Sequence, residues 1–454
     1  MFKRIGLLLL FGLALFLVWT WDATAPTVRW TDAPAVVGRK SRIAAEFSDA
    51  GRGLRSVQVA CRQSDQRHLL LVEHYAGAGW PWQDRTSRRS LAISLESLPR
   101  GASLSEGNFL IEVTLTDQPN LWLFSRTTTV TREMRFDATP PSIEVLSGKH
   151  IIRQGGAESI LYRVQESVEA SGVRVGEHLF RGYPLHSRGE GVYVALFGLQ
   201  YNQPVDTPLL VWAVDEAGNR GRTGFGAEVV PVRFRKRKIR VSDAFIEKTA
   251  GQILAHTDQV ARKPSLLATF LEINGRLRRL NHEKIAELSR TSADHALWQR
   301  PFLQLSRSQV ESAFADNRSY EYQGKVVDQQ THLGFDLASV AHSRVECAND
   351  GVVLWAGDLG IYGQAVVVDH GLGLLSLYGH LSSIGVRKGQ TVRQGESLGR
   401  TGQTGLAGGD HLHFSLILGD IQVNPLEWWD PRWVQVHILS RLTGSEASSE
   451  KRLN

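Results

Sequence analysis

The chain has 454 residues, of which 42% are hydrophobic and 22% are charged. That length is enough for about three domains, and the composition is ordinary for globular protein and gives no indication of a largely disordered chain or a membrane protein with many spans. The formal net charge of +6 is compatible with an acidic polymer as partner, whether nucleic acid, anionic lipid or an anionic cell wall. It is equally compatible with a basic protein that has no such partner.

The N-terminus predicts a signal anchor. Lys3 and Arg4 precede an apolar run from Ile5 to Trp21, which is near the lower limit for a spanning helix. We therefore expect a transmembrane helix over residues 1–25. By the positive-inside rule, everything after it is exported, so the bulk of the chain lies in the periplasm or outside the inner (cytoplasmic) membrane.

A cleaved signal peptide is the alternative interpretation of this segment. Ala23-Thr24-Ala25 has the A-x-A pattern of a cleavage site. Pro26 would directly follow the cut, which is an unfavourable position for proline. Both interpretations export the remainder of the chain.

Residues 26–137 read as a first β-domain. Short alternating stretches such as 56–60 and 109–115 are separated by turns rich in glycine and aspartate, as at 49–53. Many short strands with regular turns predict an immunoglobulin-like β-sandwich. The two prolines in 137–141 then mark a boundary, because proline interrupts a strand and stiffens a junction.

The pattern restarts after this boundary. Residues 141–145 echo residues 26–30, which indicates a weak internal repeat of about 115 residues. The strand expected at 209–215 and the turn after it resemble late strands of bacterial immunoglobulin-like domains, which often act as spacers. We therefore predict a second immunoglobulin-like sandwich over residues 138–234.

Residues 235–317 are expected to be a basic linker and a helical connector. The basic run RFRKRKIR at 233–240 favours a solvated linker strand, with contact to anionic wall polymer or lipid headgroups as the alternative. Ser242 and the acid after it are typical of a helix start. Periodic apolar residues predict further helices at 264–274, 281–290 and 307–315.

Three histidine motifs follow within one glycine-rich, β-rich block. His332 and Asp336 are four residues apart, so on a single strand both would face the same side. His380 lies in a Tyr-Gly-His-Leu phrase, and His411 and His413 form an H-x-H pair.

The H-x-H segment has a clear strand pattern. His411 and His413 alternate with Leu412 and Phe414, which predicts imidazoles on one face and a packed apolar face on the other. Burying neighbouring histidines without a partner is costly. Each motif alone is weak evidence, but four histidines and one aspartate in about 80 residues predict a metal site. Cysteine is excluded as a paired ligand, because the two cysteines are far apart and form no CxxC.

The block resembles the catalytic domain of lysostaphin-type (LytM) zinc metallopeptidases over residues 318–432. The connecting phrases contribute to the resemblance: Asp350-Gly351-Val352-Val353, Val366-Val367-Val368-Asp369-His370-Gly371, Gly389-Gln390-Thr391-Val392, Gly399-Arg400-Thr401-Gly402 and Val423-Asn424-Pro425. It implies a β-rich domain with the duplicated hybrid motif, followed by a C-terminal tail at 433–454. It further implies a set of residue roles: His332, Asp336 and His413 as Zn²⁺ ligands, and His380 and His411 as catalytic histidines that do not bind the metal.

These assignments agree with general zinc chemistry. Three nitrogen and oxygen ligands leave a fourth position open, as catalytic rather than structural zinc sites do. Imidazole can move a proton or stabilise an oxyanion near neutral pH. No HExxH motif is present, so the glutamate base of thermolysin-type enzymes is not expected. Arg318, Tyr320 and Tyr322 lie just upstream and are candidates to line a substrate groove.

The resulting expectation is a membrane-anchored zinc metalloendopeptidase that hydrolyses peptide cross-links of bacterial peptidoglycan. Its partners would be peptidoglycan, the membrane through one helix, and possible regulatory envelope proteins; no nucleic acid is expected. The alternative is a non-enzymatic LytM-type regulator or scaffold that activates other cell-wall hydrolases. Such proteins typically lack one or more zinc ligands, whereas all the motif positions are intact here.

Overall fold

The structure is a computed structural model that describes residues 5, 10–12, 15, 22–76, 86–100, 102–119 and 124–444. It divides into two compact units. The first contains the chain up to residue 141 together with 214–220, and the second contains 142–213 and 221–454. The described residues are mainly β-structure arranged in several sheets, as the sequence predicts.

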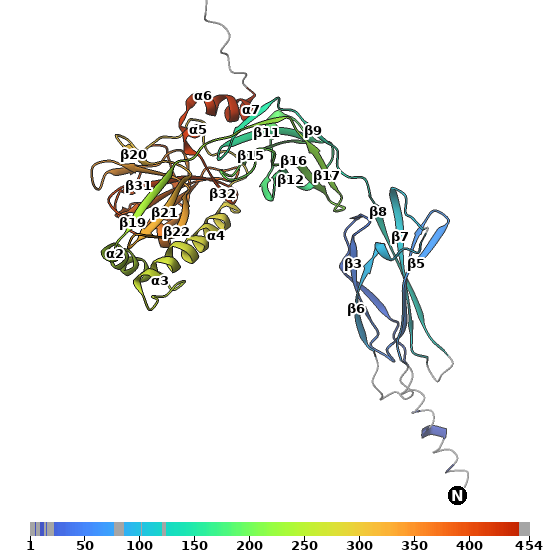
Figure 1. The fold of residues 1–454 in the computed structure, drawn as a ribbon. Helices are drawn as coiled ribbons and strands as arrows, with labels where there is room; N and C mark the ends of the chain where they lie inside the picture. Colours follow the sequence, from blue (N-terminus) through green and yellow to red (C-terminus); the bar gives the residue numbers. More distant parts are fainter. Residues whose placement is uncertain are drawn as a thin grey trace, which may run out of the picture. The chain divides into compact units, whose positions relative to one another are not determined.

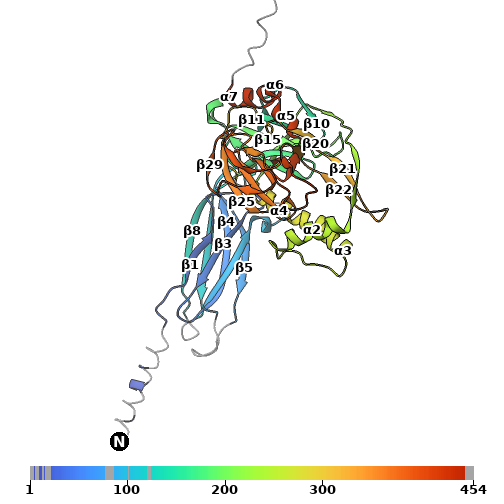
Figure 2. The same ribbon diagram turned by 90° about the vertical axis from the view of Figure 1, so that its left-hand side faces the viewer.

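The first unit is a two-layer β-sandwich (Figure 2). One sheet has the order β1-β3-β6 and the other β2-β8-β7-β4-β5. Alternating residues of β3 and β7 point inward, which places Ile43, Phe47, Ile111 and Val113 in the core. The elements of this unit are β1 (Thr27–Asp32), β2 (Val36–Val37), β3 (Arg42–Ser48), β4 (Leu54–Gln63), β5 (Gln66–His74), β6 (Arg88–Ser94), η1 (Leu95–Ser97), β7 (Gly107–Asp117) and β8 (Thr127–Phe136).

A second group of strands, β9 to β18, follows the double proline and is called the second sandwich below. Its main sheets have the orders β14-β15-β11-β9 and β13-β12-β16-β17, and β10 pairs with β18. The elements are β9 (Ile143–Val145), β10 (His150–Arg153), β11 (Ala157–Val164), β12 (Val168–Val175), β13 (His178–Arg181), β14 (Tyr183–Pro184), η2 (His186–Arg188), β15 (Val192–Gly198), β16 (Leu209–Asp215), β17 (Arg220–Gly224) and β18 (Ala227–Val230).

The remaining elements build the part of the chain that holds the histidine motifs. They begin with β19 (Lys236–Val241), α2 (Asp243–Leu254), α3 (Leu266–Leu271), η3 (Glu272–Leu277), α4 (Arg278–Ser289), β20 (Gln309–Ser312), β21 (Asp316–Tyr322), β22 (Lys325–His332), β23 (Phe335–Ala338), β24 (Arg344–Glu346) and β25 (Gly351–Asp358). They continue with η4 (Gly360–Tyr362), β26 (Gln364–Asp369), β27 (Leu374–Leu381), β28 (Ser383–Ile384), β29 (Thr391–Val392), β30 (Ser397–Arg400), β31 (Leu412–Leu418), β32 (Ile421–Val423), α5 (Pro425–Trp429), α6 (Pro431–Val434), η5 (Gln435–Leu439) and α7 (Ser440–Thr443).

The large sheet of this region has the order β20-β23-β31-β27-β26-β25-β29, with β32 added beside β31. Strand β31 is buried along its whole length. Leu412, Phe414 and Leu416 point into one apolar core, as the alternation predicts, and Ile417 on the opposite face joins a second core. The first core also contains strands β11 and β15, so the second sandwich and the large sheet share one interior.

Helices α2 to α4 cover the other face of the sheet (Figure 1). Ser242 caps α2 by accepting a hydrogen bond from the backbone N–H of Phe245, as the sequence predicts. Apolar side chains of the helices, including Ile246 and Phe270, pack against residues of the sheet region such as Tyr362. Helix packing therefore fixes the loop that carries Tyr362 beside the histidines.

Three segments differ from the sequence predictions. The helix predicted at 307–315 is wrong, because this stretch contains strand β20. The basic run forms a largely exposed strand, as predicted, but it is not an unpaired linker: β19 pairs in parallel with β21 over six residue pairs. Residues 433–443 of the predicted tail are helical, and Val434 and Ile438 are buried in the core shared with the second sandwich.

The predicted membrane helix at 1–25 falls mostly on residues outside the described ones. Among the residues that the structure does describe, no helix is both long and apolar enough to cross a membrane. The prediction therefore gains no support from the structure.

Glu427 on α5 ties the large sheet region to the second sandwich. Its Oε2 accepts a hydrogen bond of 2.8 Å from the backbone N–H of Ala157 at the start of β11. Burial, together with the nearby carboxylate of Glu158, raises the pKa of Glu427 to about 8.

This raised pKa predicts a pH-dependent stability. Between about pH 4.3, the ordinary pKa of glutamate, and pH 8, the folded state holds a proton that the unfolded state releases. The contribution of Glu427 is therefore largest below this window and is lost as the pH rises through it. In calorimetric unfolding at pH 5, 6, 7 and 8, Glu427→Gln should lose less stability with rising pH than the parent chain. The exposed Glu283→Gln variant is the control, and equal pH profiles for all three proteins would contradict the assignment.

Candidate metal centre

Neighbouring strands bring the predicted site residues together. Asp336 on β23 lies directly opposite His413 on β31, and Gly379 on β27 lies opposite His413 on its other side. His380 follows Gly379, and His411 immediately precedes β31. The order β23-β31-β27 thus gathers residues from separate parts of the chain at one end of the sheet.

His332 reaches the site differently from the sequence prediction. It ends β22, which belongs to a separate sheet, and Asp336 lies on β23, so the expectation that one strand carries both is wrong. Leu333 and Gly334 make the turn between the strands. A Cβ at Gly334 would lie 2.6 Å from the His413 ring, so this position requires glycine for the close approach of the two segments.

Three potential ligand atoms converge at the centre of the site. Nε2 of His332 lies 2.9 Å from Oδ1 of Asp336 and 3.0 Å from Nδ1 of His413. Nδ1 of His413 lies 3.0 Å from the same Asp336 oxygen. All three residues are buried and form a group that can hold a metal ion.

Hydrogen bonds on the outer side of the His332 and His413 rings determine which ring nitrogen faces the centre. Nδ1 of His332 is 3.1 Å from the carbonyl of Ala313, so it donates there and leaves the Nε2 lone pair inward. The Ser415 hydroxyl donates to the carbonyl of Leu333 and therefore accepts from Nε2 of His413 at 2.9 Å. His413 consequently presents Nδ1.

Two imidazole lone pairs and a carboxylate oxygen within 3.0 Å of one another repel each other. A bound cation removes this repulsion. The donor set of two nitrogens and one oxygen, without sulfur, fits the three protein ligands of a catalytic zinc site. The outer hydrogen bonds orient both rings, as is usual for metal-bound histidines.

Asp336 is held in its charged form. Burial would raise its pKa, but the surrounding imidazoles of His332, His411 and His413 outweigh burial and hold the pKa well below the usual value. Its second oxygen accepts a 2.6 Å hydrogen bond from the guanidinium of Arg318. That contact leaves Oδ1 directed at the histidines.

His380 and His411 form a second imidazole pair beside this centre, with ring centroids 4.8 Å apart. Nδ1 of His380 bonds the carbonyl of Thr404, and Nδ1 of His411 bonds the carbonyl of Gly409, which leaves both Nε2 atoms unused by these bonds. His380 has φ of 63°, a conformation costly for a non-glycine residue and often found at functional sites.

The two rings differ in their affinity for a proton. Burial and the neighbouring imidazoles hold the pKa of His380 well below its ordinary value. Burial also acts to lower the pKa of His411, but its hydrogen bond to Asp336 and the charge of Asp336 outweigh burial and raise it.

The site opens into a groove of about 680 Å³. The groove is lined by the four histidines and Asp336 and also by four arginines, namely Arg237, Arg240, Arg278 and Arg318. Tyr320 lines it as well, as predicted. Tyr322 does not contribute to this lining among the described residues; its hydroxyl donates to Asp243 instead.

Several neighbours of the site were not predicted from the sequence. Ser415 orients His413, and the buried Tyr362 lies against the His413 ring with centroids 5.3 Å apart. Ser415 continues the alternation of the H-x-H strand, so its position on the histidine face was visible in the sequence. Tyr362 comes from a short turn after β25 and carries no such local signal.

The comparisons with known proteins concern the same part of the chain. The model of Peptidase family M23 matches residues 330–425, the stretch that contains all five site residues. Residues 330–425 form a peptidase family M23 domain. The match confirms the family resemblance predicted from the sequence.

Relatives of this M23 domain carry names from cell-wall metabolism. The chain is 39% identical over 95 residues to the DD-carboxypeptidase/endopeptidase Mpg of Neisseria meningitidis serogroup B, covering 21% of this chain and 22% of that protein. It is 34% identical over 122 residues to the peptidoglycan DD-endopeptidase ShyA of Vibrio cholerae, covering 27% and 28% respectively. The chain thus aligns with about a quarter of the length of these relatives.

Solved structures include a peptidase M23 from Pseudomonas aeruginosa. The match has a TM-score of 0.38 and 22% sequence identity, and it covers 61% of this chain and 94% of that one. A zinc-containing peptidase from Vibrio cholerae matches with a TM-score of 0.26 and 15% identity, over 70% of this chain and 81% of that one. These scores are too low to transfer function.

The contact between Ser415 and His413 predicts that metal affinity depends on the serine hydroxyl. In Ser415→Ala, Nε2 of His413 loses its acceptor, so the ring is no longer fixed in the tautomer that presents Nδ1. We expect zinc affinity to fall by about 10–100-fold in competition with a chelator. The exposed Ser383→Ala variant should match the parent chain. Unchanged affinity in Ser415→Ala would show that the hydroxyl does not orient the ligand.

Proposed function

We propose that the M23 domain is a zinc-dependent metalloendopeptidase that hydrolyses peptide cross-links of bacterial peptidoglycan. The observation that carries the proposal is the convergence of three inward-facing donor atoms at the groove, beside two further imidazoles. The family match and the names of the relatives support the choice of peptide bonds in peptidoglycan as substrate.

In this proposal His332, Asp336 and His413 hold the zinc ion. Their donor atoms belong to the classes that catalytic zinc sites use, and each is oriented by an outer hydrogen bond. Zinc, when bound, supplies Lewis acidity toward a substrate carbonyl and a water molecule.

His380 and His411 are proposed as the catalytic histidines. A backbone carbonyl fixes Nδ1 of each ring, and both residues line the groove. Nε2 of His380 is not used by that bond, and Nε2 of His411 lies 3.5 Å from Oδ1 of Asp336, at the edge of the metal centre. From these positions one imidazole can take the proton of an attacking water and the other can donate to the developing oxyanion or leaving amine. Arg318 keeps Asp336 oriented.

We further propose an envelope location, with the chain exported and anchored by its N-terminal segment. Its support is the sequence of Lys3 and Arg4 followed by the apolar run to Trp21. The first sandwich would then act as a spacer between the membrane and the wall. The second sandwich shares its core with the M23 domain, so we assign it to the support of that domain.

Incubation of the purified chain with peptidoglycan tests the proposal. Mass spectrometry should detect muropeptides cut within cross-link peptides, and a zinc chelator should abolish their release. His332→Ala and Asp336→Ala should lose bound zinc and activity together. His411→Ala should retain one zinc per chain while kcat falls by about 10²–10⁴-fold, because only the proton-handling group is lost.

The controls separate enzyme from regulator. His342→Ala removes an exposed histidine outside the groove lining and should leave zinc content and activity unchanged. Zinc-loaded chain that releases no muropeptide, but stimulates a second cell-wall hydrolase, would replace the proposal with the regulator alternative. Zinc content unaffected by all the site variants would overturn the ligand assignment.

The groove arginines predict a substrate that carries carboxylates. Arg237 and Arg318 are engaged by Ser312 and Asp336, and Arg278 by Asn274. Arg240 is exposed on β19 and lines the groove without an ion pair among the described residues. It is therefore the arginine best placed to contact a substrate anion.

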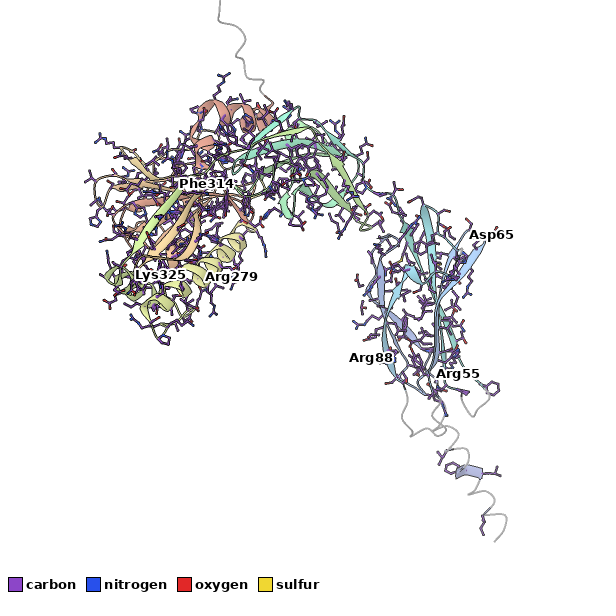
Figure 3. All side chains as sticks on the ribbon, viewed as in Figure 1. Arg55, Asp65, Arg88, Arg279, Phe314 and Lys325 are labelled. Carbon is purple, nitrogen blue, oxygen red and sulfur yellow. The ribbon has the colours of Figure 1, made fainter. Side chains whose placement is uncertain are left out.

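Replacing this residue should weaken substrate binding. In Arg240→Gln we expect KM for cross-linked muropeptides to rise about tenfold at unchanged zinc content, because one charge-assisted hydrogen bond is lost. Lys325→Gln, at the turn between β21 and β22 and labelled in Figure 3, is the charge-matched control. A rise of KM in the control as large as in Arg240→Gln would attribute the effect to net charge alone.

A further inference from the structure

A second group of possible ligand residues lies in the first sandwich, outside the M23 domain. Asp22, Asp49 and Asp117 are all buried, and one carboxylate oxygen from each lies within 4.8 Å of the others. Asp22 precedes β1, Asp49 follows β3, and Asp117 ends β7. Three segments that are distant in the sequence therefore place negative charge at one point.

The turn after β3 wraps around Asp22. Oδ2 of Asp22 accepts a 2.6 Å hydrogen bond from the backbone N–H of Arg52. A Cβ at Gly51 would lie 1.8 Å from the Asp22 carboxylate, so only glycine allows this approach. Oδ1 of Asp49 accepts from the N–H of Gly51, which positions the second carboxylate on the same turn.

The side chain of Asp117 independently indicates that a ligand binds between these carboxylates. The residue is 0% exposed, and among the described residues its Oδ2 has no hydrogen-bond partner, while its Oδ1 accepts from the backbone N–H of Arg126. No salt bridge to Asp117 occurs among the described residues. Burial and the charges of Asp49 and Asp22 raise the pKa of Asp117. A buried anionic oxygen without a partner is strongly unfavourable unless a cation compensates it.

The start of each sandwich repeats the same phrase. Asp22-Ala23-Thr24-Ala25-Pro26 and Asp137-Ala138-Thr139-Pro140-Pro141 share the pattern D-A-T-x-P at an offset of 115 residues. In both copies the aspartate accepts a hydrogen bond from the backbone N–H of the threonine two residues later. Asp22 therefore belongs to a short sequence pattern, with the same local hydrogen bond, that occurs at the start of both sandwiches.

We propose that Asp22, Asp49 and Asp117 bind one calcium ion. The donors are all oxygen, which excludes a preference for zinc or other softer metals. Calcium accepts carboxylates together with carbonyls and water in an irregular sphere of six to eight ligands, whereas magnesium keeps several waters and prefers few carboxylates. The ion neutralises three carboxylates and offers the orphan oxygen of Asp117 a partner.

Bound calcium joins the chain before β1 to the turn after β3 and the end of β7. It therefore rigidifies the end of the sandwich at which the chain enters. This site is independent of the proposed peptidase activity, because none of its residues lies in the M23 domain.

The test uses the full-length zinc-loaded chain. Isothermal titration with calcium chloride should show binding with a dissociation constant of about 10⁻⁴–10⁻³ M, the range of extracellular calcium modules. Saturating calcium should raise the Tm of the first sandwich by roughly 5–10 °C. Magnesium at the same concentration should give a smaller shift.

Asp117→Asn is the decisive variant. It should bind one calcium fewer than the parent chain and should lose the calcium-dependent rise in Tm. Without calcium it should be at least as stable as the parent chain, because one like charge has been removed. If Asp117→Asn does not fold, Asp49→Asn serves the same purpose.

The matched control is Asp65→Asn, at the tip of the hairpin between β4 and β5. Figure 3 shows Asp65 at one end of the sandwich and Arg55, which follows the acidic turn, at the other. This variant should bind calcium as the parent chain does. Equal calcium stoichiometry in Asp117→Asn and the parent chain, or no calcium-dependent shift in Tm in the parent, would overturn the proposal. Zinc content and peptidase activity can remain intact in either case.

Discussion

The pairing of β23 with β31 places Asp336 directly opposite His413, and the rest of the centre is arranged around this contact. Oδ1 of Asp336 and Nδ1 of His413 lie 3.0 Å apart, and Nε2 of His332, which comes from a separate sheet, lies within 3.0 Å of both atoms. Such a group is stable only with positive charge among its members. Arg318 donates a hydrogen bond to Asp336, and the Ala313 carbonyl and the Ser415 hydroxyl accept hydrogen bonds from His332 and His413. These bonds do not relieve the repulsion; they orient the ligand atoms that produce it.

The architecture around the centre serves to hold these strands in register. Strand β31 is buried on both faces, with one face in the core shared with the second sandwich and the other beneath α2 to α4. Since β31 carries His413 and pairs with both β23 and β27, any shift in its register would move three site residues at once. This explains why a small site depends on such extensive packing.

Much of this arrangement could be predicted from the sequence because it is local. The alternation from His411 to Leu418 predicts the buried strand and its histidine face, and Ser242 predicts the start of α2. The errors involve non-local structure. Gly334 turns the chain between His332 and Asp336, and the strand expected in the basic run pairs with β21 instead of forming a free linker. The contact of Arg318 with Asp336 joins strands of two different sheets and has no signature in a single segment.

X-ray absorption at the zinc edge of the zinc-loaded chain tests the central claim most directly. Two imidazole nitrogens from His332 and His413, one carboxylate oxygen from Asp336 and one water oxygen predict four ligands in all, at about 2.0–2.1 Å. His413→Ala should reduce the imidazole count from two to one or prevent binding, and His411→Ala should leave the spectrum unchanged. A spectrum that shows sulfur ligands, or one that changes with His411 and not with His413, would contradict the account.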